Sequence, residues 1–246
     1  MKNGAIKTAS LILALFVLSV TTNAQRKNID FVNPFIGTGG HGHTFPGATL
    51  PFGMVQLSPD TRMEGWDGCG GYHYDDTYVY GFSHTHLSGT GCSDLSDILL
   101  MPVTGTPPLE YKDGKPAFGS KFSHSNEIAK TGYYEVFLDD YSTKVQLTAT
   151  QRGGFHQYTF PKAEKNVSVI VDLNYRDEVI ETKLTRVSDT EIEGYRISRG
   201  WSVKQHVYFV ARFSKPIKEI KSIKAGKGDI ASLLFDNSKN QVLKVK

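Results

Sequence analysis

The pattern of hydrophobic and polar positions divides this chain into two unlike parts. From Phe118 onward, short apolar runs rich in Val, Ile, Thr, Tyr and Phe alternate with turn residues, and many runs repeat with a period of two. That period is typical of half-buried strands, and strands spaced about 8–12 residues apart without a helical stretch predict an antiparallel β-sandwich or barrel. The expected strands are 133–138, 144–149, 155–160, 167–173, 179–187, 190–197 and 206–213.

The part of the chain before these strands is rich in loops. Between Phe35 and Leu95 only two short strands are expected, at 53–57 and 79–83. Long irregular stretches are uncommon in compact domains and are usually functional. Glycine, histidine, aromatic and acidic residues are concentrated between Asn33 and Pro102. This mixture suits a pocket for a polar, ring-shaped ligand better than a folding core.

Turn residues complete the picture at two places. Asp113-Gly114 has the composition of a two-residue hairpin turn, although Pro116 argues against a paired strand there. Residues 230–246 hold two apolar runs around an Asn-Ser turn, and the chain ends inside this alternating pattern. That ending favours the hypothesis that the chain is a fragment, although a domain can also end on a strand.

The first 24 residues predict an export signal. Lys2 and Lys7 precede a nearly uninterrupted apolar run from residue 9 to 20, and the small residues Thr22 and Ala24 precede Gln25. This order is typical of a cleaved signal peptide, so we expect an exported protein, periplasmic or extracellular. The alternative, an N-terminal membrane anchor, is disfavoured because a spanning helix needs about 20 apolar residues. No membrane span is expected after the signal is removed.

Composition fits one globular domain over residues 25–246. Hydrophobic residues make up 39% and charged residues 22% of the chain, which is unlike a disordered protein. The formal net charge is +3, and two of the lysines lie in the signal. The remaining chain is therefore close to neutral, and nucleic acid is not an expected partner.

Several polar clusters are candidates for chemistry, each with an ordinary structural alternative. The histidine pairs His41/His43 and His84/His86 have a spacing that could share a metal ion on a strand, or they could simply hydrogen-bond within loops. Carboxylates occur in two groups, and turn-stabilising roles are the default for them. These groups are Asp75-Asp76 and Asp94/Asp97.

Trp66 stands among Gly65, Asp67 and Gly68. A tryptophan on a glycine-rich loop beside a carboxylate is typical of a sugar platform, where the ring packs on C–H groups and the carboxylate accepts hydroxyls. The alternative is a tryptophan that covers a sheet edge. The two cysteines, Cys69 and Cys92, could form a disulfide in an exported protein, remain as buried thiols, or line a pocket as thiols.

Long and unusual motifs in this region resemble those of one known family. The segments VNPFIGTGGHGHTFPGATLPFGMVQLSPD, WDGCGGYHYDD, GFSHTHLSGTGCSDLSDILLMP and TGYYEVFLDDY, which fall between Asn33 and Phe160, resemble the N-terminal domain of glycoside hydrolase family 92. Members of that family are exported, calcium-dependent, exo-acting α-mannosidases, which hydrolyse terminal α-linked mannose from glycans such as N-glycans. The resemblance implies a mutarotase-like β-sandwich that packs on an (α/α)6 barrel.

The resemblance also implies how the work is divided within such an enzyme. Inversion needs an acid and a base, expected on the barrel together with most calcium ligands, while loops of the N-terminal domain contact the substrate. We carry this substrate-binding role to Trp66, Asp67, Gly68 and Cys69, with weaker candidates at His84, His86 and Ser88.

Members of this family are several hundred residues longer than this chain. We therefore expect the chain to lack the acid and the base and to show no turnover alone, with a mannose-containing glycan and the missing barrel domain as partners. An alternative is an autonomous carbohydrate-binding domain of sandwich type. A mutarotase-type epimerase is disfavoured, since no histidine–glutamate pair for that chemistry is identifiable.

Overall fold

The computed structural model describes residues 27–246, which belong to two compact units, Met1–Val32 and Asn33–Lys246. In the first unit, the described residues form one short 3-10 helix, η1 (Asn28–Phe31). The amide of Lys27 closes its start by donating to the Asp30 carboxylate at 3.0 Å. The predicted signal peptide, residues 1–24, lies outside the described residues.

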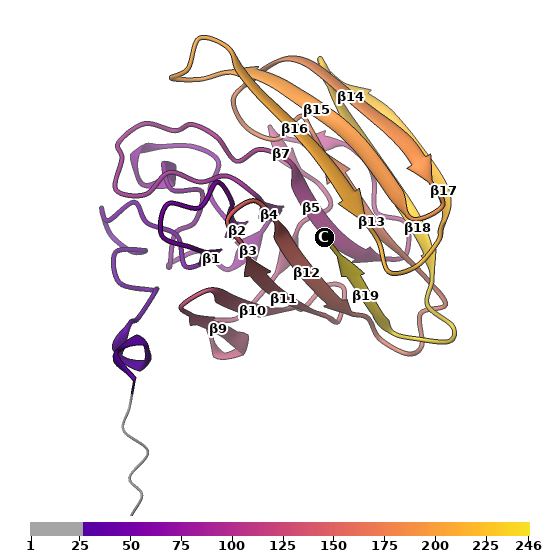
Figure 1. Cartoon of the computed structure of the whole chain (residues 1–246), viewed down its shortest axis with the longest axis horizontal. Coiled ribbons are helices and arrows are strands. Elements are labelled where there is room, and N and C mark those ends of the chain that lie inside the picture. Colours follow the sequence, from indigo (N-terminus) through magenta and orange to yellow (C-terminus); the bar gives the residue numbers. More distant parts are fainter. Residues whose placement is uncertain (1–26) are drawn as a thin grey trace, which may run out of the picture. The chain divides into compact units, whose positions relative to one another are not determined.

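The second unit is built from antiparallel sheets (Figure 1). The largest has seven strands in the order β1-β2-β4-β5-β13-β18-β17. Its strands are β1 (Ala48–Thr49), β2 (Gln56–Asp60), β4 (Gly81–Ser83), β5 (Leu99–Thr104), β13 (Asn166–Asp172), β18 (Gly228–Asp236) and β17 (Ile217–Ala225).

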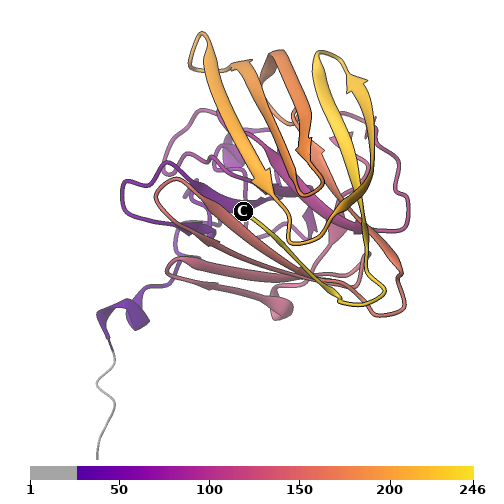
Figure 2. The same cartoon turned by 45° about the vertical axis from the view of Figure 1, so that its right-hand side comes forward.

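Two further sheets complete the sandwich, and Figure 2 shows the strands from a second side. A five-stranded sheet, in the order β19-β12-β11-β10-β9, is formed by β19 (Val242–Val245), β12 (Gly154–Thr159), β11 (Thr143–Ala149), β10 (Tyr133–Leu138) and β9 (Glu127–Lys130). A three-stranded sheet consists of β14 (Glu178–Ser188), β15 (Glu191–Arg199) and β16 (Gln205–Arg212). β11 contacts β1 and β2, and β14 contacts β18, so both smaller sheets meet the largest one.

Short elements fill the connections. Two small ribbons pair β3 (Tyr78–Val79) with β8 (Ser120–Lys121) and β6 (Tyr111–Lys112) with β7 (Lys115–Pro116). The other 3-10 helices are η2 (Trp66–Gly68) and η3 (His124–Asn126). None of the helices among residues 27–246 is long and apolar enough to cross a membrane.

The period-two pattern of the sequence explains the core. Along β10, Tyr134, Val136 and Leu138 are buried and alternate with less buried positions. In β13 nearly every position is buried, because the strand lies inside the largest sheet between β5 and β18. The predicted all-β antiparallel sandwich with a loop-rich N-terminal half is confirmed.

Most expected strands are found within one or two residues of their predicted bounds, and two departures and one expected turn are instructive. The strand expected at 53–57 begins at Gln56 instead, because Phe52 is left-handed (φ 59) and Gly53 closes a turn onto Leu50. The Asp113-Gly114 hairpin is formed with both residues left-handed (φ 51 and 77), as a type I′ turn requires.

Sequence reasoning missed β5, which contains Pro102 in the middle of a sheet. A proline usually excludes a central strand because it has no amide to donate. Here β4 pairs with β5 only at Leu100. On that side of β5, no β4 residue lies opposite Pro102, so the missing proline amide breaks no hydrogen bond between the two strands. The other neighbour, β13, pairs with β5 along its whole length.

Candidate functional site

Three loops meet around the side chain of Trp66. His43, from the glycine-rich loop 37–44, places its ring edge-on to the indole, with ring centroids 4.9 Å apart and an interplanar angle of 75°. The same imidazole holds the third loop through a 2.7 Å hydrogen bond between its Nδ1 and the Thr90 carbonyl. His43 is buried, whereas Trp66 is 62% exposed, so a fixed indole presents an open face to solvent.

The third loop can approach the indole because residue 91 is glycine. A Cβ atom built on Gly91 would lie 2.3 Å from the Cη2 atom of Trp66. Real Cβ atoms do not approach a ring that closely, so any side chain at position 91 would displace the indole or the loop. The sequence signal for this contact was only the general glycine richness of the region.

The Asp67 carboxylate lies beside Trp66 on the short helix η2. Its Oδ1 atom is 2.7 Å from Nδ1 of His41 and 3.4 Å from Nε2 of His43. The hydrogen bond from His41 is the main cause that lowers the pKa of Asp67 below its usual range, so the group is an anion at neutral pH. Among the described residues no donor reaches its Oδ2 atom, which leaves one oxygen available to a ligand.

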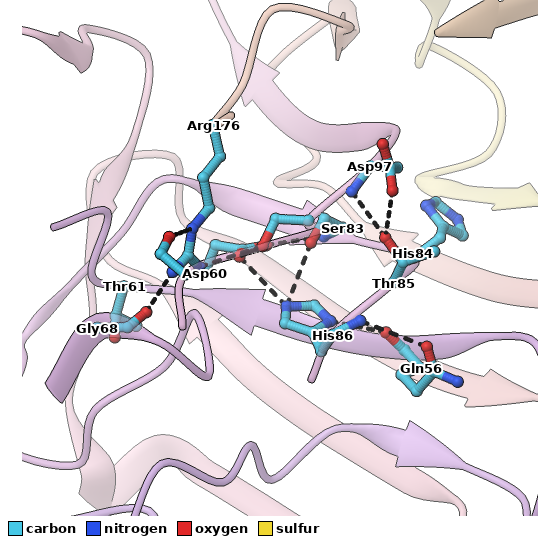
Figure 3. A network of polar contacts seen from close by, with 12 residues as sticks. Gln56, Asp60, Thr61, Gly68, Ser83, His84, Thr85, His86, Asp97 and Arg176 are labelled. Carbon is cyan, nitrogen blue, oxygen red and sulfur yellow. Dashed lines mark hydrogen bonds and ion pairs between the residues drawn. The ribbon is translucent and has the colours of Figure 1, made fainter. Parts of the chain in front are cut away.

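The backbone of Gly68 and Cys69 is tied to a buried arginine. Nη2 of Arg176 donates to the Gly68 carbonyl at 2.5 Å and to the Cys69 carbonyl at 3.4 Å. Its Nε atom donates to Oγ of Ser93 at 2.8 Å. Arg176 therefore joins the Trp66 loop to the loop before β5, and Figure 3 shows its guanidinium pointing toward Gly68.

His86 belongs to the interior of the sandwich, within the network of Figure 3. Its Nδ1 atom is 2.8 Å from the Gln56 carbonyl, and its Nε2 atom is 3.2 Å from Asp60 Oδ1. Asp60 is fully buried and also accepts hydrogen bonds from the Ser83 amide and the Ser96 hydroxyl, both at 3.0 Å. The histidine thus links β2 to the loop that follows β4.

His84 is also committed to internal contacts. Its Nδ1 atom is 2.6 Å from the Ile98 carbonyl, and its Nε2 atom is 3.0 Å from Nε2 of His156. Burial lowers the pKa of His84 to about 4, so its ring is neutral at physiological pH. Ser88, the last of the predicted substrate contacts, is exposed on the loop that precedes Gly89.

The two cysteines are free thiols in the structure, and the disulfide considered between Cys69 and Cys92 is not formed. Cys69 is buried and Cys92 is exposed. Burial is the main cause that raises the pKa of the Cys69 thiol. The buried-thiol alternative therefore describes Cys69 and not Cys92.

Sequence reasoning did not identify a buried ion pair behind the site. The guanidinium of Arg196 pairs with the Asp97 carboxylate, and both side chains are fully buried. Arg196 also donates to the carbonyls of Leu173, Tyr175 and Arg176. It thereby fixes the backbone that carries Arg176, and no local sequence pattern signals a contact across about 100 residues.

The carboxylate pair of Asp94 and Asp177 was also not foreseen. Burial is the main cause that raises the pKa of Asp177 to about 7, with the Asp94 carboxyl adding to it against the opposing effect of Arg196. The Asp94 carboxyl therefore lies near enough to Asp177 to contribute to this shift. Within residues 27–246 no group of three or more His, Cys, Asp or Glu side chains is arranged to hold a metal ion.

Comparison with known proteins places this antiparallel β-sandwich, with its loop-borne indole and carboxylate, in the glycoside hydrolase class. A family model described as "Glycosyl hydrolase family 92 N-terminal domain" matches residues 31–246, and the chain belongs to this family.

Solved structures of this family have the same fold. The family GH92 α-mannosidase BT3965 from Bacteroides thetaiotaomicron, solved in complex with mannoimidazole, is 34% identical with a TM-score of 0.80, over 89% of this chain and 32% of that one. The GH92 glycosyl hydrolase ccman5 is 25% identical, with a TM-score of 0.76, over 89% of this chain and 32% of its own. The inverting mannosidase BT2199 from the same Bacteroides species is 26% identical, with a TM-score of 0.74, over 90% and 31%.

A curated relative agrees with the class. An "uncharacterized secreted glycosidase" of Arthroderma benhamiae is 28% identical over 179 residues, which is 66% of this chain and 22% of that protein. The chain therefore spans about a third of the length of the solved relatives and about a fifth of the curated one.

Proposed function

We propose that this chain lines the substrate pocket of an exported α-mannosidase that removes terminal α-linked mannose from glycans. The observation that carries the proposal is the exposed, immobilised indole of Trp66 beside the half-bonded carboxylate of Asp67. The mannoimidazole complex of one structural relative supports mannose as the sugar.

The geometry suits one face of a pyranose. An indole that is held edge-on by a buried imidazole gives a flat apolar surface with little freedom to lose on binding, and such a surface packs on the C–H face of a sugar. The anionic Asp67 has a free oxygen that can accept hydroxyl protons next to that surface. His84 and His86 hydrogen-bond to groups inside the domain, so we assign them a structural role behind the pocket and not a contact with the sugar.

We place the acid, the base and most calcium ligands in the part of the longer relatives that this chain does not match. The loop between β1 and β2 is consistent with contact to a second domain. Leu50, Phe52 and Met54 are exposed on this loop, and Phe52 is completely exposed. Large exposed apolar side chains grouped on one loop are typical of an interaction surface. Calcium removal is therefore expected to leave the stability of this chain unchanged.

A mannose titration followed by NMR tests the proposal. The chain should bind mannose weakly, with a Kd of about 1 mM or more, and Trp66→Ala should weaken binding by about 5–30-fold, equivalent to the roughly 1–2 kcal/mol of a lost stacking contact. Trp201→Ala is the matched control, since Trp201 is also highly exposed (72%) but lies on the loop before β16. Equal affinity of the Trp66→Ala variant and the parent chain would refute the assignment.

A second measurement addresses turnover. The purified chain, incubated with an aryl α-mannoside and calcium, is expected to release no mannose. Robust release would contradict the division of labour proposed here, even if the Trp66 result agreed with it.

The exposure of Trp66 in this chain alone also favours a second candidate, an autonomous carbohydrate-binding module. Such a module needs useful affinity without a second domain. Binding of a mannose-containing glycan with a Kd below about 100 µM, again lost in Trp66→Ala, would favour the module over the pocket wall.

A further inference from the structure

The last strand of the chain joins two sheets at a single corner. β19 pairs along its length with β12, and its end then reaches β16 (Figures 1 and 2). There the amide of Arg212 donates to the Lys246 carbonyl at 2.8 Å, and the amide of Lys246 donates back to Arg212 at 2.9 Å. Phe213 and Val245 form the adjacent bridge. The five-stranded and three-stranded sheets are therefore continuous at this corner.

The remainder of β16 has one free edge. Within the described residues β16 pairs only with β15, on its other side. In an antiparallel ladder, every second residue directs both its amide and its carbonyl to the same edge. Since Arg212 directs these groups toward Lys246, the backbone groups of Val210, Tyr208 and His206 point to the free edge.

This edge lacks the protection that the sheet edge at β17 carries. β17 has Lys218, Lys221 and Lys224 along its length, and charged side chains of this kind discourage strand addition. The run His206–Ala211 of β16 contains no Lys, Arg, Asp, Glu, Gly or Pro. An edge strand with an uncharged run of six residues is a template for another strand.

A groove runs beside the free edge. Its volume is about 490 Å³, and it extends from Lys246 between β16 and the strands β5 and β12, with residues 54–55 before β2 and 84–85 after β4 also lining it. Its apolar lining includes Val207, Phe209, Ala211, Ile98 and Leu100. Tyr208 and Val210, which alternate with these residues, also border the groove, and their side chains are largely exposed.

We infer that the β16 edge is a docking site for one further extended polypeptide strand, which enters in line with β19 and runs antiparallel to β16. The occupant continues the two-way hydrogen-bonded pair of Arg212 and Lys246, so its second, fourth and sixth residues past Lys246 lie opposite Val210, Tyr208 and His206. Its first, third and fifth residues face the groove and are apolar. About two-thirds of each solved relative has no counterpart in this chain, and the occupant that we infer is the segment that follows the matched part in such longer family members.

Two fusions of identical composition test this register. One adds Val-Thr-Val-Thr-Val-Thr after Lys246, and the other adds Thr-Val-Thr-Val-Thr-Val. Amide exchange at His206, Tyr208 and Val210 is measured by NMR in both fusions and in the parent chain. The first fusion should slow these three amides by at least about tenfold relative to the second.

A proline control separates edge pairing from general stabilisation. Tyr208→Pro in the first fusion removes an amide that points to the free edge and leaves the ladder with β15 intact, so it should restore fast exchange at Val210. Equal exchange in the two unmodified fusions would overturn the inference, and that comparison does not depend on the folding of the proline variant. Slow exchange of all three amides in the unfused chain, together with a concentration-dependent dimer in sedimentation, would also overturn it, since a second copy would then hold the edge.

Discussion

Replacement of Arg196 by alanine should destabilise this chain more than any surface change and should loosen the Trp66 loop. The Arg196 guanidinium is fully buried, pairs with the buried Asp97 carboxylate and donates to the carbonyls of Leu173, Tyr175 and Arg176. Alanine leaves a buried carboxylate without its cation and three carbonyls without their donor. Breaking a buried pair from one side typically reduces the free energy of unfolding by about 3–5 kcal/mol.

The loss of unfolding free energy in Arg196→Ala is expected at the upper end of that range. The three backbone carbonyls that Arg196 serves would lose their donor, and each buried acceptor without a donor adds its own desolvation penalty. The Asp97 carboxylate keeps two donors, the Thr85 hydroxyl at 2.8 Å and the Gln205 amide at 2.6 Å, which prevents a larger loss. Since whole domains have unfolding free energies of about 5–15 kcal/mol, this single change removes a large share of the stability.

Urea denaturation followed by tryptophan fluorescence measures the loss. The matched control is Arg199→Ala, because Arg199 and Glu178 form an exposed pair at 3.6 Å on the same sheet, and such pairs contribute about 0–1 kcal/mol. Arg196→Lys should fall between the two, since lysine retains the charge but not the planar fork. A loss below about 1 kcal/mol in Arg196→Ala would refute the view that this ion pair supports the loop that carries Arg176.

Two further predictions concern the carboxylate pair and the indole. Asp177 retains its proton in the folded chain up to about pH 7 but ionises near pH 3.8 when unfolded, so it reduces the stability as pH rises through this window. Asp177→Asn should therefore unfold with the same urea midpoint as the parent chain near pH 4. At pH 8 the variant should be more stable than the parent by roughly 1–2 kcal/mol, after allowance for the partial exposure of Asp177. A stability difference that stays constant from pH 4 to pH 8 would contradict the raised pKa. Gly91→Ala should displace the Trp66 indole and reduce mannose binding about as much as Trp66→Ala, because the new Cβ would lie 2.3 Å from the ring. The control Gly39→Ala should bind normally, because its Cβ would lie no closer than 3.6 Å to its nearest neighbour, Tyr74. Retained binding by Gly91→Ala would contradict the packing described for the three loops.

The strands of the second half follow from local pattern. In β10 and β12 the alternation of buried and less buried positions is written directly in the sequence, so their bounds were predicted closely. β5 escaped prediction because Pro102 is an unfavourable strand residue unless the neighbouring strand ends early, and only the register of β4 reveals that it does. Local rules fail there because the hydrogen-bond partner is set by residues far away in the chain.

The candidate site divides in a similar way. Trp66 and Asp67 could be singled out from their glycine-rich surroundings, and the structure adds the immobilising contacts of His41 and His43. Asp60 and Arg196, which organise the buried network behind the loops, carried no distinctive local signal, because their partners are up to about 100 residues distant in the sequence.

The sequence by itself determined the antiparallel sandwich, the loop-rich first half and the exposed tryptophan, because periodicity, glycine content and residue type act over a few neighbouring positions. The tertiary structure alone decided which histidines face inward, that Cys69 and Cys92 are free thiols, and that β16, among the described residues, has an open edge beside Lys246. These features depend on strand register and on close packing between distant segments, which no local pattern encodes.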